Sequence, residues 1–227
     1  MRQQYEPSAD RIIALYQQLE DDILSAVIRR ILKVGYVSEA SKHQLEVLQA
    51  AGLLYADIVQ LIADRTDACT AQVRALFEDA GVQTVAIDNS LHEAAGALPI
   101  DIRQDSSTRQ VLEAGYKKTL GTMQNLVRTT ATQTQTAFIQ TCDRIYMQVS
   151  SGAFSYQEAI MNALRALADT GATVSYPTGH TDRMDVAVRR CVLTGVGQTA
   201  AAVSLRQAED AGCYLMEITA HSGARPD

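Results

Sequence analysis

The stretch PSADRIIALYQQLEDDILSAVIRRILKV, residues 7–34, decides the fold class of this chain. Its aliphatic residues recur at steps of three and four, and residues at that spacing lie on one face of an α-helix. Pro7 and Ser8 suit the first turn of a helix, and Gly35 suits the position just after its end. The stretch therefore predicts a long amphipathic helix whose buried stripe consists of Ile12, Leu15, Leu19, Ile23, Val27, Ile31 and Val34.

The composition also favours a core of packed helices. Hydrophobic residues make up 47% of the 227 residues, aromatic residues make up only 5%, and there is no tryptophan. Such a core must consist mostly of leucine, isoleucine, valine and alanine. The scarcity of aromatic residues argues against a protein that binds single-stranded nucleic acid, because such proteins stack bases on aromatic side chains.

The charge balance argues against DNA as the main partner. The net charge is −6 and the pI is about 5.2, whereas a protein that wraps duplex DNA neutralises many phosphates with Lys and Arg. DNA contact stays open only as a secondary role. The N-terminal residues lack the apolar segment of a secretion signal, and the longest uncharged runs, 129–142 and 191–205, are too short to span a membrane. We therefore expect a soluble protein without a membrane partner.

The next part of the chain is predicted to form a series of shorter helices separated by glycines. Ser38 suits the N-cap of a helix whose buried stripe includes Leu45 and Leu48. Gly52 is expected to interrupt that helix, and Gly81 to end a later one, because glycine is the commonest residue after a helix end. A less regular helix then follows.

A long helical region closes the first part of the chain. Residues 96–105 are expected to form a connection, and residues 109–149 to form either one helix or two that meet at Gly115 or Gly121. Together these elements predict a helical body over residues 1–150.

The segment RTTATQTQTAFIQT, residues 128–141, is unusual for a helix interior, because threonine has a low helix propensity. The favoured interpretation is a partly exposed helix whose threonine hydroxyls bond to carbonyl groups one turn earlier. The alternative is a polar helix–helix interface between copies of the protein. It gives a candidate interaction surface that consists of Arg128, Thr132, Gln135 and Thr136.

A smaller α/β unit is predicted for residues 151–227. Gly152 should end the long helix, and SYQE, residues 155–158, matches a capping box. Gly171 should end the helix that this capping box begins.

An extended segment, ATVSYPTG at residues 172–179, follows. We expect the next helix to be capped by Thr181 or Asp182 and to end at Gly212. CYLMEITA, residues 213–220, alternates as a β-strand does. A single strand needs a partner, which is either the extended segment or further chain.

No motif for a cofactor or a metal is present. The sequence lacks GxGxxG, HExxH and GxSxG, and no two cysteines form a CxxC pair. We therefore expect no cofactor and no metal site. The cysteines are expected to be reduced and buried: Cys69, Cys142, Cys191 and Cys213.

The strongest charge cluster joins Arg183, Arg189 and Arg190 with Asp182 and Asp185. It could bind an anion, but the interspersed carboxylates favour ion pairs within the protein.

His221 and Arg225 flank a glycine-containing turn after the predicted strand, a common position for catalytic groups. The sequence ties no nucleophile or carboxylate base to them. We therefore expect no enzymatic activity and no catalytic residue.

The segments RMDVAVRRCVLTGV, residues 183–196, and TAHSGARP, residues 219–226, resemble the bacteriophage minor capsid protein 2 family. The segments at residues 7–31, 48–58 and 114–131 look like the same family, so the likeness runs from end to end.

The resemblance implies a structural protein of the virion head, present in few copies near the portal vertex. It implies incorporation during procapsid assembly in the host cytoplasm, and a role in head assembly and in genome packaging or ejection. The implied partners are the portal protein, the major capsid protein or both, with other copies of the chain as a further option.

Family members continue beyond the GARP motif, so the resemblance implies that a chain ending at Asp227 is the first part of a longer protein. His221 and Arg225 match the motif but have no role that the resemblance assigns. The alternative function is a carrier of a C-terminal enzymatic or toxin-like effector domain, of which this segment would be the start.

Overall fold

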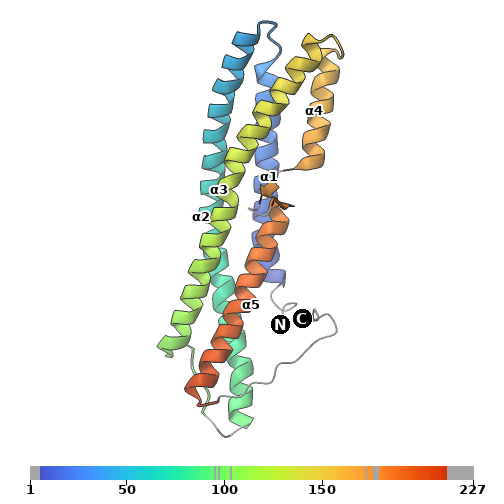
Figure 1. The fold of residues 1–227 in the computed structure, drawn as a ribbon. Coiled ribbons are helices and arrows are strands. Elements are labelled where there is room, and N and C mark those ends of the chain that lie inside the picture. Colours follow the sequence, from blue (N-terminus) through green and yellow to red (C-terminus); the bar gives the residue numbers. More distant parts are fainter. Residues whose placement is uncertain are drawn as a thin grey trace.

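Five helices and a two-stranded sheet form the described part of the chain (Figure 1), so the predicted mainly α fold is confirmed. The computed structural model describes residues 6–94, 96, 98–102, 104–171, 173–175 and 179–213. The elements are α1 (Glu6–Val34), α2 (Ala40–Ala94), α3 (Ser106–Ser150), α4 (Tyr156–Thr170), β1 (Thr173–Ser175), β2 (Thr181–Arg183) and α5 (Met184–Asp210). α2 and α3 run the length of an elongated bundle, with α4 beside one half of α3 and α5 beside the other (Figure 1).

α2 is one continuous helix, so the prediction that Gly52 and Gly81 interrupt it is wrong. A glycine inside a helix costs only about 1 kcal/mol relative to alanine, and packing along the helix readily offsets that cost. Gly81 is buried, and a Cβ there would lie 2.6 Å from Leu112 Cδ1 of α3. Gly81 therefore makes room for a neighbouring helix and does not reverse the chain.

α3 also continues through its two doubtful joints, Gly115 and Gly121. Gly115 faces Thr199 of α5, and a Cβ at Gly115 would lie 2.0 Å from the Thr199 Oγ1. The reciprocal pair is Gly195 of α5 and Thr119 of α3, at 2.1 Å. Each helix thus offers a glycine to a threonine of the other, which lets the two backbones approach closely.

The beginning of α4 is confirmed. The Ser155 N–H donates to the Glu158 carboxylate at 2.9 Å, and the Glu158 N–H donates to the Ser155 hydroxyl at 3.3 Å, which completes the predicted capping box. Gly171 follows the helix with φ +66°, a conformation that favours glycine.

α5 does not begin at a Thr181 or Asp182 cap, so that prediction is wrong. Its N-cap is Arg183, whose side chain makes no capping hydrogen bond. Thr181 and Asp182 belong to β2, which pairs antiparallel with β1 and places Asp182 opposite Val174. Thr181 and Asp182 pair with β1 in the sheet, so neither residue is available as the N-cap of α5. The predicted end near Gly212 is confirmed, since α5 ends at Asp210.

Side chains from all five helices form one buried apolar cluster. α5 packs against α1, α2 and α3, and α4 packs against α3 and α1. The cluster therefore contains residues from both sides of residue 150, where the two predicted units meet. The division into two units stays a prediction.

The buried face of α2 differs from the predicted one. Leu45 and Leu48 are 57% and 60% exposed, whereas Val47, Ala51 and Leu54 are buried. Both faces of this segment are apolar, so helical periodicity alone did not identify the face that meets the bundle. The predicted strand at residues 213–220 lies outside the described residues, apart from Cys213.

Candidate interaction surface

The predicted surface on α3 lies on the outer side of the bundle. Arg128, Thr132 and Thr136 follow one another at steps of four residues, and all three are exposed. Gln135 differs from them, because it is half-buried and its Nε2 donates to the carbonyl oxygen of Ala51 in α2 at 3.2 Å. Three of the four predicted residues therefore face outward, and Gln135 connects α3 to α2.

Two threonine hydroxyls of the segment at residues 128–141 bond to their own helix. Thr136 Oγ1 donates to the carbonyl oxygen of Thr132 at 3.0 Å, and Thr129 Oγ1 donates to that of Leu126 at 3.0 Å. These contacts confirm the interpretation that the hydroxyls bond back to an earlier turn. The donors of these two hydroxyls are used within the helix, so at Thr129 and Thr136 a partner would meet methyl groups and hydroxyl lone pairs.

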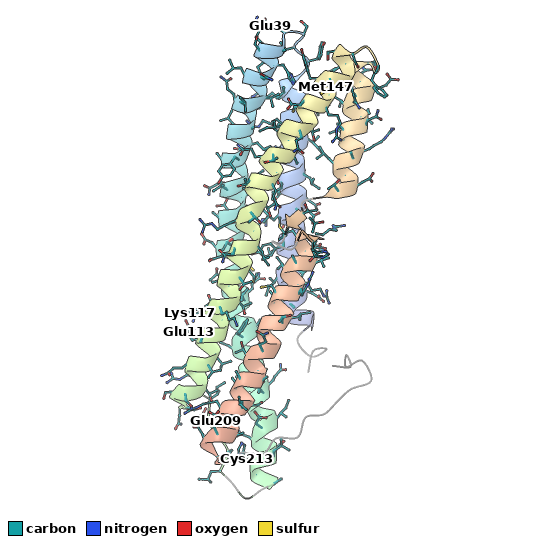
Figure 2. The ribbon with its side chains drawn as sticks, viewed as in Figure 1. Glu39, Glu113, Lys117, Met147, Glu209 and Cys213 are labelled. Atoms are coloured by element: carbon teal, nitrogen blue, oxygen red, sulfur yellow. The ribbon has the colours of Figure 1, made fainter. Side chains whose placement is uncertain are left out.

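The same part of α3 is uncharged, in contrast to the ends of the helix. Between Arg128 and Asp143 the sequence contains no charged residue. Towards the start of α3, Glu113 and Lys117 form an ion pair at 3.3 Å (Figure 2). A partner could therefore cover residues 129–142 without the desolvation cost of a charge.

The charge cluster at the start of α5 consists of ion pairs, which confirms the favoured interpretation. Arg190 pairs with Asp182, and Arg183 lies 3.5 Å from Asp185. Burial opposes ionisation of Asp182, but the hydrogen bond with His180 and the charge of Arg190 outweigh it and lower the pKa of this carboxyl. The arginines of this cluster therefore form ion pairs within the protein and do not make a free anion-binding site.

A buried carboxylate connects this cluster to α1. Glu20 is 3% exposed, and its Oε1 lies 3.6 Å from Arg183 Nη2 of β2. The turn after α4 covers the same group, because a Cβ at Gly171 would lie 2.6 Å from Glu20 Oε1. Arg189 also reaches α1, where its Nη1 lies 3.4 Å from Asp10. These contacts fix the start of α5 against α1.

A groove of about 560 Å³ lies between α3 and α5. Its lining includes the two glycine–threonine pairs of the helix crossing, with Lys118 and Arg190 also among the lining residues. Most of the other lining groups are small or apolar, so the groove suits an apolar side chain better than a reacting group.

The cysteines are free, and three of them are poor nucleophiles. Burial raises the pKa of Cys69 and of Cys191 to about 11 and that of Cys142 to about 12, so these thiols stay protonated at neutral pH. Cys69 and Cys142 are buried and Cys191 is half-buried, but Cys213 is exposed, which corrects the prediction for that residue. Over the described ranges, no three His, Cys, Asp or Glu side chains are grouped closely enough to hold a metal ion.

Two sets of residues complete the comparison with the sequence. His221 and Arg225 lie outside the described residues. The structure adds the exposed apolar residues of α2, of which Leu45 and Leu48 were predicted to lie in the core. The signal for them was present in the sequence, because residues 45–62 of α2 are apolar on more than one side of the helix.

The comparisons with known proteins identify one similar family. A family model described as phage minor capsid protein 2 matches residues 2–227, which is nearly the whole chain. No curated protein and no solved structure matches.

Proposed function

The chain belongs to the phage minor capsid protein 2 family, and on that premise we propose that it is a minor head component at the portal vertex. Membership of this family makes it a structural component of a phage virion. The proposal adds the place and the role: the protein docks on the portal protein, the major capsid protein or both during head assembly, and takes part in genome packaging or ejection.

The observation that carries the docking role is the outer face of α3, which has no charged residue between Arg128 and Asp143, together with the length of the helices. α2 and α3 contain 55 and 45 residues, which corresponds to about 80 Å and about 70 Å at 1.5 Å per residue. Helical proteins bind partners through such exposed faces. A rod of this length can contact more than one subunit of a surrounding assembly.

The internal bonding of the polar groups supports a structural role over catalysis. The arginines at the start of α5 are paired with carboxylates, and burial keeps three of the four thiols protonated. The overall negative charge also favours a protein surface over DNA as the main partner.

A charge-reversal variant tests the docking face. Arg128→Glu with Thr132→Glu places two carboxylates on the exposed side of α3, and Gln135 is left unchanged because it bonds to α2. If a partner covers this face, the copy number in purified heads should fall at least about tenfold, since burying an unpaired carboxylate costs several kcal/mol and 1.4 kcal/mol is a factor of ten. Quantitative mass spectrometry against the major capsid protein measures the copy number.

The matched control changes the same charge elsewhere. Arg165→Glu with Asn162→Glu lies on the exposed side of α4, and its copy number should stay at the wild-type value. A photo-crosslinking residue at position 132 then identifies the partner in intact heads. If the α3 variant is incorporated at the wild-type level, α3 is not the docking face. A crosslink to a protein remote from the portal vertex would contradict the proposed location.

A further inference from the structure

A pocket of about 320 Å³ lies between α2 and α3, near Glu113 (Figure 2). We call it the α2–α3 pocket. Its size is at the lower end of the range for ligand sites, so it has room for one large side chain or a small molecule. Large apolar side chains form most of its lining: Phe77, Val82, Ile102, Leu112 and Tyr116.

Two features fix the shape of the α2–α3 pocket before any ligand binds. Phe77 and Tyr116 are buried and meet edge to face, with their ring centroids 6.3 Å apart. Asn89 holds the connection that carries Ile102, because its side chain donates to the Ile100 carbonyl oxygen at 2.8 Å and accepts from the Ile100 N–H at 2.7 Å. A ligand therefore meets a preformed site and does not have to order it.

Four charged side chains also line the pocket, and only two of them are paired. Arg74 lies over the Tyr116 ring, 4.7 Å from its centroid, and 3.5 Å from the Glu113 carboxylate. Glu78 and Arg109 are exposed, and neither has an ion-pair partner among the described residues. The pocket thus offers one unpaired carboxylate and one unpaired guanidinium.

The two unpaired charges lie at opposite ends of the pocket. α2 and α3 are antiparallel, and Phe77 of α2 contacts Tyr116 of α3. Glu78 is therefore level with position 115 of α3, and Arg109 lies six residues, or about 9 Å, nearer the start of that helix. A segment that fills the pocket meets a carboxylate at one end and a guanidinium at the other.

The charges of the lining decide which class of partner fits. The two arginines and two glutamates sum to zero, so the pocket does not attract DNA or an anionic lipid surface, both of which require an excess of basic residues. An uncharged partner would remove Glu78 and Arg109 from water without a counter-charge, which is costly. A partner with one basic and one acidic residue pairs with both. The apolar walls require a large apolar side chain between those two residues, and aromatic anchors are common in pockets of protein interfaces.

We propose that the α2–α3 pocket binds a segment of a partner protein in which one large apolar side chain is flanked by a basic and an acidic residue. The apolar side chain fills the pocket, the basic residue pairs with Glu78, and the acidic residue pairs with Arg109. The site lies at residues 109–116 of α3, apart from the outer face at residues 128–136, and it does not depend on the proposed location at the portal vertex.

Binding of short synthetic peptides to the full chain tests the ligand class. The peptide acetyl-Glu-Gly-Phe-Gly-Lys-amide should bind with a Kd of about 1 mM in methyl NMR titrations, with nuclear Overhauser effects from its ring to Val82, Ile102 and Leu112. Glutamine in place of both charged residues should weaken binding about tenfold, and alanine in place of phenylalanine should abolish it up to about 10 mM. No binding of the first peptide to the wild-type chain overturns the proposal.

Reversal of one charge tests the pairing. Arg109→Glu should weaken the first peptide about tenfold, and acetyl-Lys-Gly-Phe-Gly-Lys-amide should then bind as tightly as the first peptide binds the wild-type chain. Arg144→Glu is the matched control, because Arg144 is exposed on the same helix but far from the pocket, and its variant should keep the wild-type affinities. A loss in Arg109→Glu that the lysine peptide does not recover shows that charge pairing is not the cause, and overturns the proposal.

A larger side chain at the mouth of the pocket tests where the ring binds. Val82 lines the pocket and is 54% exposed, so Val82→Phe should fill the space and abolish peptide binding. Val59→Phe is the control, since Val59 is 43% exposed on the same helix and lies away from the pocket. Circular dichroism checks that each variant is folded. Unchanged binding by Val82→Phe overturns the proposal.

Photo-crosslinking in intact heads tests the source of the segment. A photoreactive residue at position 75, which is exposed on α2 one turn before Glu78, should crosslink to a protein segment with a large apolar residue between a basic and an acidic one. A crosslink to DNA, or to a segment without this pattern, overturns the proposal. Free L-phenylalanine that binds as tightly as the first peptide assigns the pocket to a small zwitterion and also overturns it. None of these outcomes bears on the copy-number test of the α3 face.

Discussion

Gly195 has no Cβ, and the Cβ of any other residue at this position would clash with the side chain of Thr119. The crossing of α3 and α5 depends on this residue and on Gly115, which accepts Thr199 in the same way. Threonine is β-branched and has few rotamers in a helix, so it cannot easily turn aside. Thr199 Oγ1 also donates to the carbonyl oxygen of Gly195 at 2.8 Å, which holds that side chain in place.

Gly195→Ala should therefore destabilise the protein although alanine is the better helix former. The new Cβ would lie 2.1 Å from Thr119 Oγ1 and 2.8 Å from its Cγ2, and overpacking of this kind costs about 1–3 kcal/mol. Urea denaturation measures the free energy of unfolding.

Gly197→Ala is the matched control, because its Cβ would meet nothing within 4 Å. That variant should be stabilised by up to about 1 kcal/mol through helix propensity alone. Thr119→Ala combined with Gly195→Ala should recover part of the loss. Equal stabilisation by Gly195→Ala and Gly197→Ala would show that the two helices do not approach closely at Gly195.

α4 depends on its cap more than the other helices do. It has only 15 residues, a length at which an isolated helix is marginal in water. Its buried residues Ala159, Ile160 and Ala163 are mostly small, and the larger side chains that it packs against the core, such as Leu164 and Leu167, are only partly buried. The capping box at Ser155 satisfies amide groups that would otherwise have no partner.

Ser155→Ala should loosen α4 while leaving the long helices intact. Loss of an N-cap hydroxyl costs about 1 kcal/mol, and the effect should appear as roughly fivefold faster hydrogen exchange of the α4 amides. Ser150→Ala provides the control, because this exposed hydroxyl bonds only to the Met147 carbonyl of its own helix. Acceleration spread evenly over α2 and α3 would mean that α4 is not a separate unit of local opening.

α2 shows why an element is not defined by periodicity alone. In residues 45–62 the buried and exposed faces both carry large aliphatic side chains. A sequence pattern of this kind fits two different buried stripes, and the choice of Leu45 and Leu48 for the core was wrong. The neighbouring helices decide which face is covered.

At the scale of the whole molecule, one apolar cluster joins the helices into a single body. Three of the four cysteines sit on different long helices: Cys69 on α2, Cys142 on α3 and Cys191 on α5. Burial raises the pKa of each thiol, and only the thiolate reacts quickly with alkylating agents. Their reactivity therefore reports the opening of each helix.

In alkylation across a urea series, Cys213 should be labelled already in the folded protein. The other three cysteines should be labelled only as the protein unfolds, and all at the same urea concentration. If α5 unfolds with α2 and α3, then Cys69, Cys142 and Cys191 share one unfolding midpoint in site-resolved mass spectrometry. A lower midpoint for Cys191 alone would instead support the predicted division at residue 150.

Much of this architecture could be predicted from the sequence, because it depends on local chemistry. The stripe from Ile12 to Val34 determined α1, the SYQE segment determined the start of α4, and the interspersed charges around Asp182 determined the ion pairs. The family resemblance was equally a property of the residues and is confirmed by the match over residues 2–227.

Only the tertiary structure decided the rest. Whether Gly81 and Gly115 end a helix or continue it depends on the helices that pack beside them, because a glycine has no side chain of its own that favours either outcome. The cap of α5 moved to Arg183 because β1 pairs with the two residues before it. Which faces of α2 and α3 stay exposed likewise depends on where the other helices pack. The sequence of one helix does not specify that packing by itself.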